Sequence, residues 1–442
     1  MTYAGKWQSN CYFRFMREDL LHYVWKNQKF QKTNLKTTTG ELLEVIDAGH
    51  YNTSSGPDFF NTRICISEQE WAGNLEVHIR SSDWYVHGHE KDTNYNNVIL
   101  HVVWEDDVDV FRKDGSIIPT LQLCDYVHKT LLDSYRDFVD NTKYKFINCE
   151  KDASSIDDVF WRQWQERLFV ERLERKSTHI ALLLQKTKND WEVVLFMLLV
   201  KTFGLNKNGE AFLSMAEHLD GALIRKASKT VLHLESLFFG LAGFLSENQI
   251  EDEYYQKLKG EFEFLRNKFQ IADHVGPKPI FFGLRPANFP TIRISQLANA
   301  YGKSPNLFGR LMEANTVNAF FELFNVAASP YWDNHFTFGK ISKKRSKTLS
   351  KSFVHLVLIN AVIPLKFSYF KYQGSTEVDG LLDVMNGLAA EKNRIVDKYT
   401  AIGISSKTAF ESQAKLQLYQ EYCTQNRCLQ CHIGAALLKR KS

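Results

Sequence analysis

The pattern of apolar and polar residues over the first 130 positions predicts a sheet. Strands are expected at 41–49, 57–67, 74–80 and 98–104, with a turn around 68–73 and a hairpin over 111–123. The segment 98–104 (VILHVVW) is apolar on both faces, as in a strand at the middle of a sheet. Because helical spacing in 18–29 precedes these strands, the region is predicted to be an α+β or α/β module.

The pattern changes after Cys149. Helices are expected at 156–184, 191–203, 209–219, 232–245 and 251–270, with 206–209 (NKNG) as a turn between two of them. The boundary is placed within 141–155. The fold class is therefore predicted to be α+β, with a mixed-sheet module at 1–150 and a mostly α-helical domain at 151–442.

Length and composition narrow the class of protein. A chain of 442 residues is too long for one ordinary core, so two or three domains are expected. The net charge of +4 permits a polyanionic partner such as nucleic acid but does not require one. No run of about 18 apolar residues and no apolar signal region at the N-terminus are seen, so we expect a cytoplasmic protein with no membrane partner and reduced cysteines. The sequence does not predict the oligomeric state.

Acidic and basic residues share one face of the strand at 74–80. Alternation along this strand places Glu76, His78 and Arg80 on the same side, and the turn brings Asp58 of the preceding strand toward them. Two carboxylates and an imidazole can hold Mg²⁺ or Mn²⁺, with His78 as a base or a third ligand. Glu44, on the strand before, is a further candidate. The alternative is a solvated polar sheet face.

Four histidines fall within a short span of the sequence. These are His78, His87, His89 and His101. Imidazole nitrogens suit Zn²⁺ or Mn²⁺ better than Mg²⁺, so His101, inside the central strand, is a candidate metal ligand. The alternative is that His87 and His89 are loop residues at the surface and that His101 is a core histidine with a hydrogen-bond partner.

Three cysteines are closely spaced near the end of the chain. Cys423, Cys428 and Cys431 have C-x4-C-x2-C spacing, which is typical of a zinc site or an iron–sulfur cluster. Cys149 is the candidate for a fourth ligand. The alternative is a group of reduced cysteines that pack a helix end.

Arginines provide candidate contacts to nucleic acid. Arg285 and Arg293 flank a proline-bounded loop (RPANFPTIR), and Arg80 lies beside the acidic face, so all three are candidate phosphate contacts. A further arginine stripe in 161–176 is interleaved with glutamates, a pattern more typical of a salt-bridged helix surface.

Two resemblances add to these patterns. The Pro-Asp pair at Asp58, the hairpin and the acid-x-base triplet at Glu76 resemble the PD-(D/E)XK nuclease superfamily, whose core is a helix, a three-strand meander, a second helix and a further strand. This resemblance implies that Asp58 and Glu76 hold Mg²⁺, and His78 stands where that superfamily has a lysine. Some of these nucleases build an iron–sulfur cluster from one distant cysteine and three near the C-terminus. The distant cysteine precedes the core there, whereas Cys149 follows it here.

Longer segments are similar to a bacterial family known only as a domain of unknown function. They are 52–64, 71–89, 95–107, 285–298 and 428–434. This resemblance implies no activity, but it joins the sheet module and the helical domain in one family.

Three functions are compatible with these observations. The first is metal-dependent phosphodiester hydrolysis on nucleic acid, carried by Asp58, Glu76 and His78. The second is a non-catalytic scaffold that binds nucleic acid or protein, for which the missing lysine argues. The third is a zinc-dependent hydrolase of small molecules, which would have a closed pocket lined by His87 and His101.

Overall fold

The computed structural model describes most of the chain. The described residues are 16–52, 55–139, 145–217, 219–247, 250–272, 276–304, 306–375 and 379–441. The expected absence of a signal peptide concerns residues 1–15, which lie outside this range, as do residues 141–144 of the expected domain boundary.

Two compact units make up the chain. The first contains Met1–Trp164, Ala401–Ile404 and Leu418–Ser442, and the second contains Gln165–Thr400 and Ser405–Gln417. The helical domain predicted at 151–442 differs from the second unit, because the C-terminal residues cluster with the sheet. Helix α19 (His432–Lys441) packs against α4 (Lys129–Val139), which accounts for this clustering.

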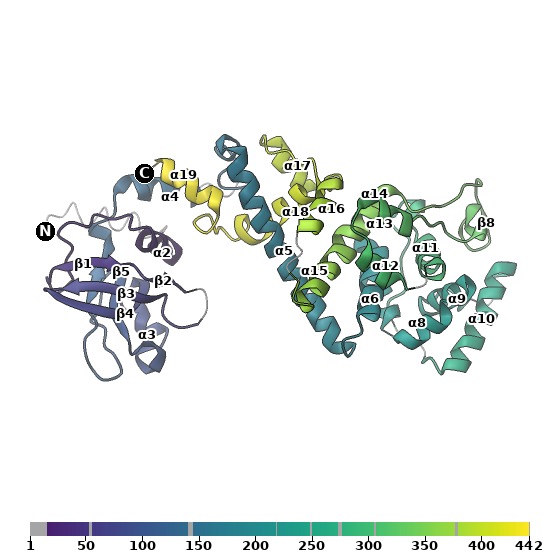
Figure 1. Cartoon of the computed structure of the whole chain (residues 1–442), viewed down its shortest axis with the longest axis horizontal. Coiled ribbons are helices and arrows are strands. Elements are labelled where there is room, and N and C mark those ends of the chain that lie inside the picture. Colours follow the sequence, from purple (N-terminus) through teal and green to yellow (C-terminus); the bar gives the residue numbers. More distant parts are fainter. Residues whose placement is uncertain are drawn as a thin grey trace. The chain divides into compact units, whose positions relative to one another are not determined.

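The first unit contains a six-stranded mixed sheet, shown in Figure 1 with α2 and α3 beside it. Its strands are β1 (Leu43–Asp47), β2 (His50–Tyr51), β3 (Phe59–Ile66), β4 (Gln69–Arg80), β5 (Val98–Glu105) and β6 (Thr120–Gln122). The order is β1-β3-β4-β5-β6, with β2 also pairing with β3. The first pairings are antiparallel, whereas β4, β5 and β6 run parallel. Together with the helical second unit, this sheet confirms an α+β protein.

The central strands follow the apolar pattern. Every residue of β5 except the last is buried, as expected for a strand between two neighbours. The turn expected at 68–73 is shorter than predicted, because β4 already begins at Gln69. Ser67 and Glu68 both have positive φ (46° and 72°), which allows a tight two-residue turn and leaves residues 69–73 free to pair with β3.

Helix α2 (Glu18–Lys26) packs against β4 through its apolar face. Leu20, Leu21 and Trp25 are fully buried, and the Trp25 indole donates a hydrogen bond to the carbonyl of Ala48 (3.0 Å). This packing places the polar residues of α2 beside the sheet. A second, four-residue helix, α3 (Asp83–Val86), follows β4 directly.

The second unit is almost entirely helical in its described residues. Its elements are α5 (Asp158–Lys186), which begins in the first unit, α6 (Trp191–Phe203), α7 (Leu205–Ala216), α8 (Gly221–Ala227), α9 (Val231–Leu241), α10 (Glu253–Phe269), α11 (Pro290–Lys303), α12 (Leu307–Glu313), α13 (Val317–Leu323), the hairpin β7 (His335–Thr337) and β8 (Lys340–Ile341), α14 (Lys351–Val357), α15 (Ile363–Tyr372), α16 (Asp379–Gly387), α17 (Arg394–Ala401) and α18 (Ala409–Leu418). Apolar side chains from most of these helices form one continuous core.

The turn predicted at 206–209 is wrong. These residues lie inside α7, whose N-cap is Gly204. Asn208 is buried, and its side-chain amide forms two hydrogen bonds with the backbone of Ile280, both of 2.9 Å. These bonds satisfy the polar atoms of the buried amide. Asn208 is therefore used here for a tertiary contact and not for a turn.

One helical stretch departs from the expectation that no segment could span a membrane. Lys351–Tyr372 is long and apolar enough to do so by length and composition, and 72% of its most apolar window is buried inside the structure. The stretch consists of α14, a π-helical segment (Leu358–Val362) and α15.

Candidate metal centre

The two carboxylates predicted from the sequence lie next to each other. Asp58 immediately precedes β3, and its backbone N–H donates to Glu76 Oε2 on β4 (3.0 Å). In return, the backbone N–H of Val77 donates to Asp58 Oδ2 (3.0 Å). Adjacent strands thus fix both side chains by backbone hydrogen bonds, and Glu76 is buried.

Three imidazoles converge on the same point. His78, His87 and His89 each offer a ring nitrogen, and these nitrogens lie within 4.8 Å of one another. His78 comes from β4, whereas His87 caps α3 and His89 begins the following 3-10 turn. Gly88 between them is left-handed (φ 73°), a conformation that glycine adopts without strain, so both neighbouring rings can turn toward β4.

His78 has different partners on its two ring nitrogens. Its Nδ1 lies 2.8 Å from His101 Nε2, and its Nε2 lies 3.1 Å from His87 Nδ1. Glu76 Oε1 is 3.6 Å from His78 Nε2 and 3.3 Å from His89 Nε2. His101 therefore lies behind His78 rather than among the converging nitrogens, whereas His78 Nε2 faces them.

Burial controls the charge of these groups. Burial, followed by the neighbouring His101 and His89, holds the pKa of His78 far below its ordinary value, so the ring is neutral with a lone pair to offer. Burial also lowers the pKa of His101 to about 3. The pKa of Glu76 is raised, first by burial and then by the charge of Asp58.

A fourth histidine reaches the site from α2. His22 Nε2 lies 3.0 Å from Asp58 Oδ2. Burial lowers the pKa of His22, but the hydrogen bond and the charge of Asp58 outweigh it, so this pKa lies above its ordinary value. His22 is not among the site residues predicted from the sequence. Its spacing of four residues from Glu18 on one helix face was the available signal, but no local motif links it to Asp58.

A cavity of about 440 Å³ opens onto these groups. Its lining residues are Glu18, Ser55, Gly56, Asp58, Glu76, His78, His87, His89, Asp92 and Tyr95. Tyr95 stacks on His89 with ring centroids 3.8 Å apart, which orients that imidazole. His101 does not line the cavity.

The donor set fits a transition metal ion. His78, His87 and His89 supply three imidazoles and Glu76 adds a carboxylate beside His78 and His89, a combination that suits Zn²⁺ or Mn²⁺ better than Mg²⁺. Among the described residues, the buried His89 Nε2 forms no aligned hydrogen bond and has only Glu76 Oε1 (3.3 Å) beside it, which leaves this nitrogen available to a metal ion. The expected site of two carboxylates and one base is thus extended by two further imidazoles.

Neither Glu44, predicted to assist at this site, nor Arg80, predicted to contact phosphate, lines the cavity. Glu44 on β1 is exposed and lies opposite Cys65 of β3, which in turn pairs with Glu70, so it sits at the other end of the sheet from Glu76. Arg80 is exposed at the end of β4, where it pairs with Glu105 (3.5 Å).

The two arginines of the proline-bounded loop lie in the second unit and differ from each other. Arg285 is exposed. Arg293 is buried, donates to Gln296 Oε1 (2.8 Å) and Asn288 Oδ1 (2.6 Å), and stacks its guanidinium 3.5 Å from the Phe353 ring centroid. Burial lowers the pKa of Arg293 to about 10. Arg293 therefore stabilises the interior and does not present a surface contact for phosphate.

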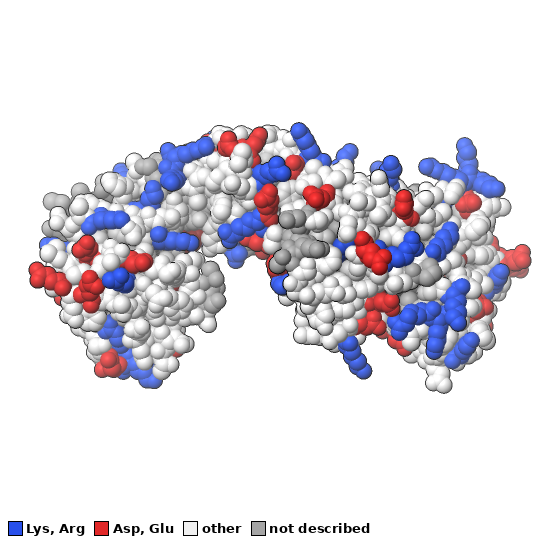
Figure 2. Space-filling model, viewed as in Figure 1, with Lys and Arg blue, Asp and Glu red and all other residues white. Residues whose placement is uncertain are grey.

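The arginine stripe of α5 forms hydrogen bonds within the structure. Arg167 pairs with Glu171 (3.0 Å), and Arg172 donates to Gln413 (2.7 Å). Figure 2 shows lysines and arginines interspersed with acidic residues on the face drawn, without an extended surface of one sign.

Three of the predicted cysteine ligands gather in the first unit. Cys149, Cys428 and Cys431 interact electrostatically with one another, and Cys423 ends a π-helical segment (Tyr419–Cys423) just before them.

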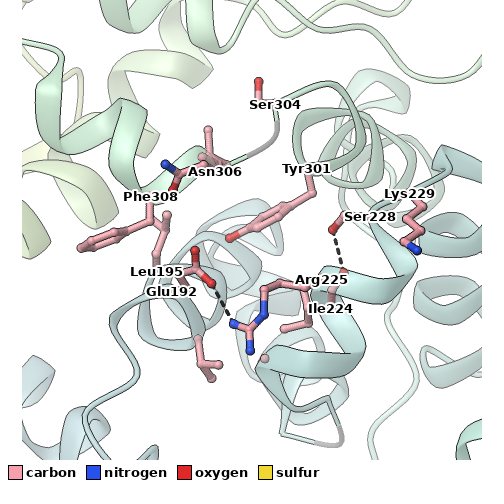
Figure 3. Close-up of a pocket in the computed structure, with 13 residues that line it drawn as sticks. Glu192, Leu195, Ile224, Arg225, Ser228, Lys229, Tyr301, Ser304, Asn306 and Phe308 are labelled. Carbon is pink, nitrogen blue, oxygen red and sulfur yellow. Dashed lines mark hydrogen bonds and ion pairs between the residues drawn. The ribbon is translucent and has the colours of Figure 1, made fainter.

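A second cavity, of about 310 Å³, lies between helices of the second unit. Figure 3 shows Arg225 paired with Glu192 (2.8 Å) at its wall and the Tyr301 ring reaching across it. Because this ion pair neutralises both charges and none of the predicted site residues line the cavity, the histidine cavity remains the candidate site.

Comparison with known proteins assigns the family. A family model described as protein of unknown function (DUF2851) matches residues 18–394. The chain belongs to the DUF2851 family. The match includes Glu76, His78, His87 and His89 but ends before the cysteine motif at 423–431. Neither a curated protein nor a solved structure matches the chain.

Proposed function

We propose that the protein hydrolyses phosphodiester bonds of nucleic acid with a transition metal ion held by Glu76, His78, His87 and His89. The observation that carries this proposal is the convergence of three imidazoles on the wall of a cavity, with the Glu76 carboxylate beside two of them. A metal ion bound there would polarise a phosphoryl oxygen and lower the pKa of a coordinated water molecule.

The residues around the ligands have separate roles. Asp58 faces the same cavity, where its carboxylate can orient a water molecule for attack. His22, hydrogen-bonded to Asp58, has a raised pKa and can give a proton to the leaving oxygen or hold positive charge near the phosphate. Together they supply the acid and base functions that hydrolysis requires.

The order of elements supports nucleic acid as the substrate. Helix α2, the meander β1-β3-β4, helix α3 and strand β5 follow the order that the resemblance to PD-(D/E)XK nucleases implies, with Asp58 and Glu76 at the corresponding strand positions. His78 stands in place of the lysine. Because His78 is neutral, it acts in this proposal as a ligand, and His22, whose pKa is raised, is the group that can supply positive charge.

A non-catalytic binding scaffold is the second candidate function. The observation in its favour is the neutral His78, which cannot supply the charge of the missing lysine. A zinc-dependent hydrolase of small molecules is less favoured, because His87 lines the cavity but His101 does not.

Nuclease assays distinguish these functions. Purified wild-type protein is incubated with labelled single- and double-stranded DNA and RNA in Mn²⁺, Zn²⁺ or Mg²⁺. The variants Glu76→Gln and His89→Ala are assayed in parallel. The control is His50→Ala, which replaces an exposed histidine of the same unit. We expect cleavage with Mn²⁺ or Zn²⁺, loss of at least 100-fold in both site variants, and normal activity in the control. If the wild type cleaves none of these substrates with any of the ions, the scaffold function is favoured.

A further inference from the structure

The cysteines of the first unit form a second, separate cluster. Cys149 lies in the turn before α5, whereas Cys428 and Cys431 lie in the turn before α19. The two turns are 280 residues apart in sequence, yet the Asn148 side-chain amide donates to Cys428 Sγ (3.3 Å). The same amide donates to Asn426 Oδ1 (3.0 Å), so the residue next to Cys149 is bonded twice to the cysteine turn.

Backbone groups are also directed at these sulfurs. The amides of Ile433 and Gly434 at the start of α19 donate to Cys431. Gly434 permits this geometry, because a Cβ at its position would lie 2.1 Å from the carbonyl oxygen of Cys428. Several N–H donors aimed at sulfur stabilise a thiolate more than a neutral thiol.

The three sulfurs are enclosed and close to one another. Cys149 and Cys428 are half-buried, Cys431 is buried, and none of the three forms a disulfide. Cys149 interacts electrostatically with both Cys428 and Cys431. Sulfurs that gather in this way and face N–H donors make a ligand set that a metal cation can bind as thiolates.

We propose that Cys149, Cys428 and Cys431 hold a thiolate-ligated metal centre, with Cys423 as the fourth ligand. Cys423 is assigned from its spacing of five residues before Cys428, at the end of the π-helical segment. This centre is independent of the proposed hydrolytic site, which uses none of these cysteines.

The spacing of the sulfurs bears on the kind of centre. Among the described residues, only His78, His87 and His89 form a group of three whose donor atoms lie within 4.8 Å of one another. Any three of the four sulfurs therefore include a pair that is more than 4.8 Å apart. A single tetrahedral zinc ion with Zn–S bonds of about 2.3 Å would hold its sulfurs only about 3.8 Å apart. The wider spread favours an iron–sulfur cluster over one zinc ion, since several iron atoms separate the thiolates.

The position of the cluster gives it a structural role. The metal centre would join the turn at residue 149 to the turn at residue 428. The chain between these turns would then form a closed loop, and Asn148 and Cys428 are 280 residues apart. A cross-link of that length restricts the unfolded chain strongly. Loss of the centre should therefore release the C-terminal helix α19 from the first unit.

Metal analysis of the full chain tests this proposal. Protein purified anaerobically is analysed for iron, acid-labile sulfide and zinc, and its absorption near 400 nm is recorded. Cys149→Ser, Cys428→Ser, Cys431→Ser and Cys423→Ser are compared with Cys124→Ser, a half-buried cysteine elsewhere in the same unit. We expect about one centre per chain in the wild type and in Cys124→Ser, and loss of at least 80% in the other variants.

Each result has a definite meaning. Iron with sulfide supports a cluster, whereas zinc alone supports the thiolate site and overturns the preference for a cluster. Retained metal in Cys423→Ser overturns its role as the fourth ligand. Wild-type protein that contains neither metal, and takes up neither on reconstitution, overturns the proposal.

Thiol counting keeps the test valid if the variants fail to fold. The thiols of the native wild type are titrated with a chromogenic disulfide before and after metal removal by a chelator. We expect four additional reactive thiols after removal, because metal-bound thiolates are protected. An unchanged count contradicts the metal centre even if no variant can be purified. Because neither readout depends on nuclease activity, failure here is distinguishable from failure of the proposed function.

Discussion

His78 Nδ1 lies 2.8 Å from His101 Nε2 in the centre of the sheet. Because both rings are neutral, one of the two facing nitrogens must carry the proton. If His78 Nδ1–H donates to His101, the His78 Nε2 lone pair faces His87 and His89. The buried His101 would thus fix both the orientation and the tautomer of a metal ligand without touching the metal.

Replacing His101 tests this positioning role. In His101→Phe, the hydrogen bond to His78 is lost while an aromatic ring still fills the buried space. We expect the dissociation constant for Zn²⁺, measured by competition with a chromogenic chelator, to rise about 10–100-fold. A circular dichroism spectrum equal to that of the wild type is the control for folding. An unchanged dissociation constant would show that His101 only fills the core.

The role of His78 is tested by restoring the lysine that the nuclease resemblance implies. In His78→Lys, an imidazole ligand is replaced by an ammonium group, which repels a cation. We expect the Mn²⁺- or Zn²⁺-dependent cleavage to fall by at least 100-fold. Preserved or increased activity with Mg²⁺ would instead show that His78 merely occupies the lysine position.

The raised pKa of Glu76 predicts how pH affects metal binding. In the metal-free protein, the folded state holds the Glu76 proton more tightly than the unfolded state, so the free energy of unfolding falls as the pH rises toward the raised pKa. A bound metal removes this penalty, because it replaces the proton. We therefore expect the increase in melting temperature on adding Zn²⁺ to be larger at pH 8 than at pH 6.

The matched variant for this pH effect is Glu76→Gln, which has no proton to lose at this position. Its metal-induced increase in melting temperature should be smaller and should depend less on pH. Equal pH dependence in the variant and the wild type would assign the effect to other groups.

Two glycine substitutions test the close approach at the cysteine turn. In a helix, alanine is more favourable than glycine by about 1 kcal/mol. Gly260 is an exposed residue of α10, and a Cβ there would have no atom within 4 Å. Gly260→Ala should therefore stabilise the protein. Gly434→Ala should destabilise it instead, because its Cβ would meet the Cys428 carbonyl at 2.1 Å. Chemical denaturation measures both changes. A stabilising Gly434→Ala would contradict the close approach of α19 to this turn.

Local patterns were sufficient to predict the sheet and many of the helices. The run 98–104 is buried on both faces and forms the central strand β5, and alternation correctly placed Glu76 and His78 on one face of β4. Strand periodicity carries this information within a few residues. It does not say which end of a neighbouring strand lies opposite, so Glu44 was wrongly expected near Glu76.

The rest of the site depends on contacts between distant elements. His22 reaches Asp58 only because the apolar face of α2 packs on β4, and His87 and His89 reach His78 only because α3 is a single short turn. Similarly, Asn208 looked like a turn residue but serves a buried contact with Ile280. The spacing of residues along the sequence carries no information about such packing between distant elements.

The position of the metal ion tests the central claim most directly. Crystals grown or soaked with Zn²⁺ would be measured on both sides of the zinc absorption edge, and the anomalous difference map would locate the ion. We predict a peak at about 2.0–2.2 Å from Glu76 Oε1, His78 Nε2 and the ring nitrogens of His87 and His89. A peak bound by Asp58 and Glu76 without any imidazole, or no peak in this cavity, would contradict it.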